Sequence, residues 1–231
     1  MADGHDLLGA IRNHYDQLSF FYRLFWGDHI HHGYWEDDEA PAAAQENLIA
    51  RLAERAAVPR GGHVLDVGCG LGGSSFWLAR HLGCSVQGIT ISPAQCAMAA
   101  TRAREEGLSE RVSFAVVDAN RLELPAESFD AVWVIECSEH LADKADFLRR
   151  AARVLRPGGR LVLLDHVASD RRWVLALERL LEPLFMRMDG DHLTRRPLPL
   201  VQAAGFSVTW SQRSKAGIIE RLIAVRPSSG A

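Results

Sequence analysis

The stretch Val64–Gly73 (VLDVGCGLGG) decides the fold of this chain. A short apolar run passes directly into a glycine cluster, and the helical pattern SSFWLARHLG then ends at Gly83. A buried strand, a tight loop and a helix in this order form the first unit of a nucleotide-binding α/β sheet. The stretch therefore predicts a parallel sheet with a ligand site at its first loop.

The same alternation of strand and helix patterns continues along the chain. Further strand patterns occupy 85–90, 111–118, 129–136 and 160–166, and the last two, 206–213 and 217–225, predict a hairpin. Ser92 and Pro93 suit the N-cap and first turn of the helix that follows the second strand. We predict a Rossmann-like α/β fold: a mostly parallel seven-stranded sheet with an antiparallel C-terminal strand and helices on both faces.

Length and composition bound the function. The chain has 231 residues, of which 48% are hydrophobic, which predicts a single domain over 1–231. Within it we expect an N-terminal helical cap (1–40), a cofactor-binding core (60–166), a substrate lid (167–200) and a C-terminal hairpin (201–227). The net charge of −3 gives no bulk attraction to nucleic acid.

Cysteine usage and hydropathy predict the compartment. The four cysteines include no CxxC pair, which favours reduced thiols over a disulfide framework or a zinc site. No apolar run reaches the length of about 18 residues that spans a bilayer. The N-terminus lacks the features of a secretory signal. We therefore expect a cytoplasmic protein with no integral membrane segment, and the oligomeric state stays open.

The glycine loop formally matches the dinucleotide fingerprint, but its neighbours argue against NAD. Asp66 lies two residues before Gly68, where its charge would lie close to a pyrophosphate. Thr90 also stands where an acid normally holds the ribose hydroxyls. S-adenosyl-L-methionine has no phosphate and carries an ammonium group, which suits Asp66. In the alternative interpretation, Asp66 only caps the tight turn.

Several motifs resemble one known family. VLDVGCGLGG and RVLRPGGRLVLLD resemble the first motif and the turn before the fifth strand of class I S-adenosylmethionine-dependent methyltransferases. Three more, WGDHIHHGYWED (26–37), GITISPAQ (88–95) and ECSEHLADKADFL (136–148), are similar to the clan that holds tocopherol-type C-methyltransferases, sterol methyltransferases and cyclopropane fatty acid synthases. The tocopherol-like branch is the nearest in appearance, and the likeness extends over about 13–165.

The resemblance implies a set of residues that hold S-adenosyl-L-methionine: Tyr34, Asp66, Gly68, Gly70, Thr90, Gln95, Asp118, Ala119 and Glu136. Thr90 and Gln95 would contact the ribose, Asp118 with the Ala119 backbone the adenine, and Tyr34 with Gly33 the methionine end. Each has a structural alternative. Gln95 forms a capping box with Ser92, Asp118 can cap the loop before Asn120, and Tyr34 can be a core aromatic.

Candidate catalytic residues follow the fourth and fifth strands. Methyl transfer mainly needs alignment of the reactants; an amine acceptor needs no base in that step, whereas a carbon acceptor must lose a proton. His140, Glu136 and Asp165 are the candidate catalytic residues, and His31 and His32 are expected to line the substrate pocket. His140 is as readily a polar loop residue. No metal site is predicted, because two adjacent histidines point apart.

The segment 171–188 is apolar over a broad face, and Pro183 should bend or break its helix. Three interpretations of this segment remain open. It can pack against the core, form a lid over a hydrophobic substrate, or present a face that touches a membrane. As a lid it would bring Trp173 and Phe185 to the substrate, with Leu177, Leu181 and Met188 as further possible contacts.

The resemblance as a whole implies methyl transfer to carbon or nitrogen of a small hydrophobic aromatic, alkaloid or isoprenoid molecule. Cyclopropane-type lipid methylation and O-methylation of a quinol or polyketide are the alternatives. A nucleoside-binding module without catalysis and an NAD-dependent dehydrogenase are the competing classes.

Overall fold

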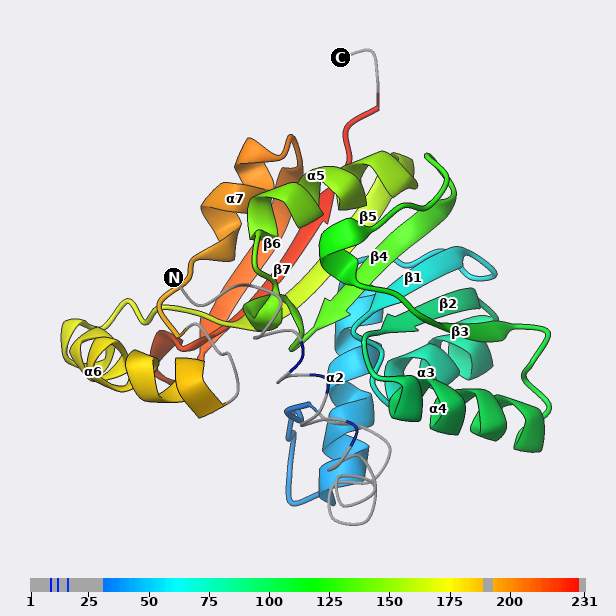
Figure 1. Cartoon of the computed structure of the whole chain (residues 1–231), viewed down its shortest axis with the longest axis horizontal. Helices are drawn as coiled ribbons and strands as arrows, with labels where there is room; N and C mark the ends of the chain where they lie inside the picture. The colour runs from blue at the N-terminus through cyan, green and yellow to red at the C-terminus, as the bar shows by residue number, and fades with distance from the viewer. Residues whose placement is uncertain (1–8, 10–11, 13–15, 17–30, 189–192, 229–231) are drawn as a thin grey trace.

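The computed structural model describes residues 9, 12, 16, 31–188 and 193–228. Most of the predicted N-terminal cap (1–40) lies outside the described residues. The described part of the chain forms one sheet with helices on both faces (Figure 1). The predicted Rossmann-like architecture is confirmed.

The sheet has seven strands in the order β3-β2-β1-β4-β5-β7-β6. Strands β3, β2, β1, β4 and β5 run parallel, and β7 runs antiparallel to both of its neighbours. This confirms the mostly parallel sheet and the C-terminal hairpin. The strands are β1 His63–Val67, β2 Ser85–Thr90, β3 Val112–Val116, β4 Phe129–Ile135, β5 Leu155–His166, β6 Ser207–Ser214 and β7 Ile219–Val225.

Strand β5 begins earlier than the sequence predicts. We expected it from residue 160, after the turn at Pro157, but Leu155 already pairs with Phe129 of β4. The register then shifts before Ala131 pairs with Arg160, which absorbs the turn residues as an irregularity inside the strand.

The helices form two layers, because successive strand residues alternate between the two faces of the sheet. Along β4, Ala131 and Trp133 face a core shared with α2, α3 and α4, whereas Val132 and Val134 face a core shared with α5 and α7. The helices are α2 Pro41–Arg55, α3 Gly73–Leu82, α4 Pro93–Glu105, α5 Lys144–Val154, α6 Arg172–Met188 and α7 Pro197–Ala203. Single 3₁₀ turns form η1 Ala119–Arg121, η2 Ser138–His140 and η3 Lys215–Gly217.

Helix α6 stands apart from the two helical layers (Figure 1). It continues through Pro183 to Met188, so of the two predicted effects, a bend or a break, the break does not occur. Trp173, Leu177, Leu180 and Leu184 on it are exposed, which excludes complete packing of this apolar face against the core. Among the described helices, none has both the length and the apolar character needed to cross a membrane.

Candidate active site

A cleft opens at the carboxyl ends of the parallel strands, the edge at which open α/β sheets bind ligands. It contains about 990 Å³ of space, part of it open to solvent. Ten of the predicted site residues line it together: His31, Asp66, Gly68, Gly70, Thr90, Gln95, Asp118, Ala119, Glu136 and His140. They come from segments up to 109 residues apart (31 to 140), so the parallel topology is what gathers them.

Asp66 is the buried carboxylate of the cleft. Only 3% of the residue is exposed, and the Ser75 hydroxyl on α3 donates to its Oδ2 at 2.6 Å. Burial raises the pKa of Asp66 to about 6, although the hydrogen bonds from the Ser75 side chain and backbone lower it. These bonds join Asp66 to the first turns of α3, so it also stabilises the loop-to-helix junction, while its place in the cleft leaves it available to a cation.

The glycine loop passes very close to the end of β4. Gly68 has a φ of +70°, and its amide donates to the carbonyl of Ile89 at 2.9 Å. A Cβ at Gly68 would lie 2.2 Å from the Cys137 sulfur, a distance that no side chain can occupy. Glycine is therefore required here both for its conformation and for the close approach of the loop to the neighbouring strand.

Thr90 and Gln95 lie together on one wall of the cleft. The Thr90 hydroxyl donates to Gln95 Oε1 at 2.8 Å, and both residues are buried. Ser92 Oγ accepts from the Gln95 amide at 3.1 Å and so caps α4. The amide of Ser92 donates to Thr90 Oγ1 at 3.2 Å rather than to the Gln95 side chain. Only half of the predicted capping box is present, and the Gln95 side chain is directed to Thr90.

Asp118 and Ala119 form the adjoining wall. Asp118 Oδ1 accepts from the Asn120 amide at 2.9 Å and from its side chain at 2.8 Å, which confirms that Asp118 caps η1. Asp118 and Ala119 also line the cleft, so the capping role leaves both residues at its surface.

Glu136, directly after β4, also lines the cleft. Its φ is +47°, an uncommon backbone conformation for a residue with a side chain. Glu136 Oε1 accepts from His32 Nδ1 at 2.7 Å and from the His32 amide at 2.9 Å. Burial raises the pKa of Glu136, but the bonds and charge of His32 lower it more, and the pKa falls below its ordinary value.

Two histidines, His31 and His140, line the same cleft. Burial lowers the pKa of His31, which favours a neutral ring at pH 7, and its Nδ1 lies 2.8 Å from the carbonyl of His32. His140, in η2, lines the same cleft. The cleft therefore combines the buried acid Asp66 with the titratable side chains of Glu136, His31 and His140.

Asp165 is not among the residues that line the cleft, and its predicted role as a base is not supported. It is fully buried, Lys144 Nζ donates to its Oδ2 at 2.7 Å, and the Ser138 hydroxyl donates to the same atom. Burial and the nearby charge of Asp165 raise the pKa of Glu139 well above its ordinary range, which keeps Glu139 protonated. Glu139 and Lys144 were not expected here, although both lie in the motif ECSEHLADK.

Four other predicted site residues are not among those that line the cleft. His32 contacts the lining residue Glu136 but is not itself part of the lining. Tyr34 packs against the core, with the Arg51 guanidinium 4.3 Å from its ring centroid, as the alternative interpretation has it. Trp173 on α6 is 68% exposed, and Phe185 is half-buried on the same helix. Neither contributes to the cleft, so substrate contact by these two residues stays a prediction.

Comparisons with known proteins show which proteins this chain is similar to. A family model described as a methyltransferase domain matches residues 65–163. The methyltransferase GfsG of Streptomyces halstedii is 43% identical over 160 residues, which cover 68% of this chain and 58% of that protein. A probable chloroplastic tocopherol O-methyltransferase of Oryza sativa subsp. japonica is 41% identical over 160 residues, 65% of this chain and 44% of that protein. The chain thus spans about half the length of these curated relatives.

Solved structures show the same fold over nearly the whole chain. The [4+2]-cyclase SpnF superposes with a TM-score of 0.81 at 27% identity and covers 95% of this chain and 96% of its own. The geranyl diphosphate C-methyltransferase of Streptomyces coelicolor A3(2), solved with S-adenosyl-L-homocysteine, has a TM-score of 0.76 at 17% identity and covers 95% and 98%. At that identity the second likeness concerns the fold alone. Residues 65–163 thus match a methyltransferase domain, and the relatives of the chain include S-adenosylmethionine-dependent methyltransferases of class I fold, tocopherol O-methyltransferases among them.

Proposed function

We propose that this protein transfers the methyl group of S-adenosyl-L-methionine to a small hydrophobic acceptor whose reacting atom belongs to a phenol or enol. The observation that carries the proposal is the cleft itself. It brings Asp66 and the glycine loop, which we take as the cofactor end, together with Glu136, His31 and His140, which we take as the acceptor end. The acid and the glycine loop suit a cationic methyl donor, whereas the titratable side chains suit an acceptor that loses a proton.

The residues of the first end fit S-adenosyl-L-methionine. Asp66 offers a buried carboxylate to the ammonium group, and Gly68 leaves room for close backbone approach. Thr90 and Gln95 offer a hydroxyl and an amide to the ribose, and Asp118 offers a carboxylate beside the adenine. A dinucleotide fits less well, since its pyrophosphate would approach the Asp66 charge.

The residues of the second end have to position the acceptor and take its proton. When bound, S-adenosyl-L-methionine supplies an electrophilic methyl on its sulfonium. Holding the acceptor in line with that methyl can lower the activation barrier by roughly 7–11 kcal/mol. His140 is the base that we propose, because it lines the cleft and a neutral imidazole accepts a proton near pH 7.

The titratable groups favour an acidic acceptor over an amine. An amine with a free lone pair attacks without a base, whereas a phenol or enol reacts as its anion, through oxygen or through the adjacent carbon. The proposal therefore includes both O- and C-methylation of one acceptor class, and it leaves N-methylation as the weaker alternative.

The first test is calorimetric titration with S-adenosyl-L-homocysteine, with NAD as the control, followed by an assay of methyl transfer to prenylated hydroquinones and phenols. Micromolar binding of S-adenosyl-L-homocysteine alone, with transfer to a phenol, supports the proposal. His140→Ala should lose turnover and keep cofactor affinity. Binding of NAD, or of neither compound, would reject it.

The likeness to SpnF supports a second candidate, cyclisation of a bound polyene without methyl transfer. The same titration and assay separate the two functions. A protein that binds S-adenosyl-L-homocysteine tightly yet transfers no methyl to any phenol, enol or amine would favour the cyclase interpretation.

A further inference from the structure

Three side chains that could bind a metal converge at the edge of the cleft. His32, Glu136 and His166 each offer a ligand atom, and these atoms all lie within 4.8 Å of one another. His32 precedes α2, Glu136 follows β4, and His166 ends β5. All three are half-buried, and the rings of His32 and His166 lie 5.2 Å apart between centroids. Among the described residues, no other group of this kind occurs.

The donor set has a recognisable chemical preference. Two imidazoles and one carboxylate form the facial triad of first-row transition-metal sites, which leaves further coordination positions open. Neighbouring ligands at metal bonds of about 2.1 Å lie about 3.0 Å apart in octahedral geometry and about 3.4 Å apart in tetrahedral geometry. His32 Nδ1 and Glu136 Oε1 are already 2.7 Å apart. To bind one metal, the ligand atom of His166, which lies within 4.8 Å of this pair, would move closer, and His32 Nδ1 and Glu136 Oε1 would separate slightly.

The backbone holds Glu136 in place for this role. Its left-handed conformation is of the kind that persists at functional sites because the surroundings determine it. The amide of His32 also donates to Glu136 Oε1 at 2.9 Å, so the segment before α2 is attached to the end of β4. This backbone contact keeps the His32 imidazole beside the Glu136 carboxylate whether or not His166 approaches them.

We propose that His32, Glu136 and His166 bind one divalent transition-metal cation, such as Zn²⁺, and that its open positions accept an oxygen of the acceptor. The second half rests on the proposed function. Glu136 lines the cleft, so a cation bound to it lies next to the acceptor end. There it would favour the anionic form of a phenol or enol. The sequence pattern did not predict this site, because the adjacent pair His31 and His32 was the metal candidate visible in it.

The competing arrangement needs no metal. In it, a proton bridges His32 and Glu136, and His166 packs against the His32 ring without serving as a ligand. The two arrangements differ in stoichiometric binding of a metal, which can be measured without any acceptor.

The test uses the full chain, free of any affinity tag, and metal alone as the probe. Zn²⁺ is titrated by calorimetry, and Co²⁺ is added separately to record the visible absorption of a bound ion. We expect one Zn²⁺ per chain with micromolar or tighter affinity. His166→Ala and Glu136→Gln should each weaken binding at least tenfold, and the second keeps the shape of the side chain.

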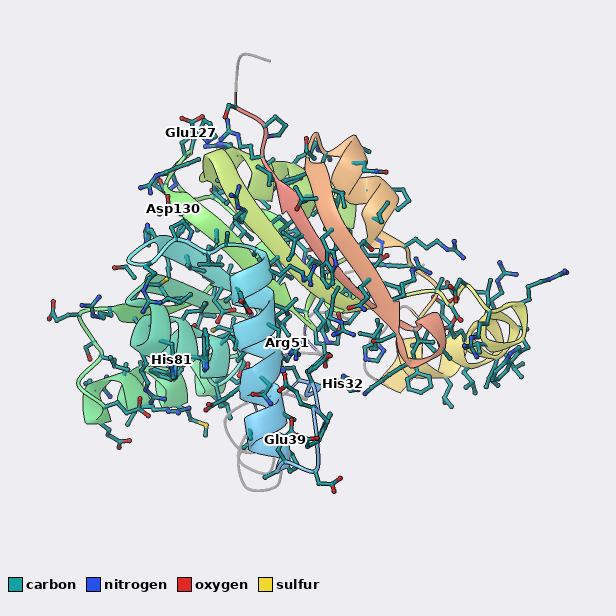
Figure 2. All side chains as sticks on the ribbon, turned by 180° about the vertical axis from the view of Figure 1, so that it is seen from behind. His32, Glu39, Arg51, His81, Glu127 and Asp130 are labelled. Carbon is teal, nitrogen blue, oxygen red and sulfur yellow. The ribbon has the colours of Figure 1, made fainter. Side chains whose placement is uncertain are left out.

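His81→Ala is the matched control, because His81 is exposed on α3 and stacks on Trp77. Figure 2 shows His81 and His32 on opposite sides of α2. The control should bind Zn²⁺ as the parent does. The absence of stoichiometric Zn²⁺ binding, or equal binding by the parent and His166→Ala, would overturn the proposal.

S-adenosyl-L-homocysteine binding, measured on the same samples, separates this outcome from failure of the proposed function. Its retention without any metal binding rejects the metal site alone. If the parent does not bind S-adenosyl-L-homocysteine, the proposed function is rejected, whereas the result of the Zn²⁺ titration still holds.

Discussion

At the scale of the residue, Asp66 links protonation to ligand binding. Its pKa, raised by burial to about 6, means that most of the carboxyl is neutral at pH 5 and ionised at pH 7. The nearby thiols of Cys69 and Cys137 stay neutral in this range, because burial raises their pKa values. We expect the affinity for S-adenosyl-L-homocysteine to rise about tenfold from pH 5 to pH 7. Calorimetry across this range measures it.

Asp66→Asn is the control for that pH dependence. The variant should bind weakly at every pH, with a flat profile over the same range. A raised pKa also means that the native state loses stability as pH rises from about 4 through 6. The substitution should therefore raise the free energy of unfolding at pH 7, by about 3 kcal/mol at most. Parent-like affinity in the variant would contradict the assignment of Asp66 to the ligand.

Gly68 gives a second prediction at this scale, and Gly61 provides its matched control. Both have a φ of +70°, but a Cβ on Gly61 would meet open space, whereas one on Gly68 would collide with Cys137. Gly61→Ala should cost about 1–2 kcal/mol for its backbone conformation alone. Gly68→Ala should cost roughly 1–3 kcal/mol more and abolish cofactor binding. Denaturant unfolding and calorimetry measure both effects, and equal losses would argue against the collision.

At the scale of the element, two residues at the start of α4 have different expected roles, one structural and one in ligand binding. Ser92 caps the helix through the Gln95 amide, while the Gln95 side chain contacts Thr90. Ser92→Ala should lower the free energy of unfolding by about 1 kcal/mol. Gln95→Ala should weaken S-adenosyl-L-homocysteine binding with little change in stability. Thermal unfolding and calorimetry distinguish them; a stability loss in Gln95→Ala at unchanged affinity would return Gln95 to a purely structural role.

The start of α5 is joined to the end of β5 by a buried ion pair between Lys144 and Asp165, both less than 5% exposed. Removing one partner of such a pair leaves an uncompensated buried charge, so Lys144→Met should cost about 3–5 kcal/mol. Arg149→Met is the control, because Arg149 forms an exposed pair with Asp146 on the same helix. That change should cost less than about 1 kcal/mol. Similar unfolding midpoints for the two variants would refute the buried role.

At the scale of the whole molecule, the cleft couples ligand binding to global stability, since its walls come from the ends of β1, β2 and β4. A ligand that binds only the native state at 100 times its Kd adds about 2.7 kcal/mol. For a chain of this size, S-adenosyl-L-homocysteine should then raise Tm by roughly 5–10 °C. Differential scanning fluorimetry measures it, with NAD as the control. An unchanged Tm at the same concentration would contradict binding of S-adenosyl-L-homocysteine to the native state.

The sequence by itself determined the sheet and the cofactor end of the cleft. Strand and helix periods are local patterns, and the carboxyl ends of parallel strands meet at one edge. The order of strands and helices along the chain is therefore enough to bring Asp66, Thr90 and Asp118 together. Their local alternatives are visible in the sequence as well, because the caps at Ser92 and Asp118 involve residues two or three positions away.

Only the tertiary structure decided the acceptor end. Whether Asp165 is a base or a buried partner of Lys144 depends on packing between β5 and α5, which no local pattern encodes. Tyr34 packs at the core in contact with Arg51, and this contact joins the segment before α2 to α2 itself. The convergence of His32, Glu136 and His166 depends on three chain segments 30 to 134 residues apart. Side-chain contacts at such separations follow from the three-dimensional fold rather than from periodicity, which is why the chemistry of the acceptor end could not be derived from the sequence.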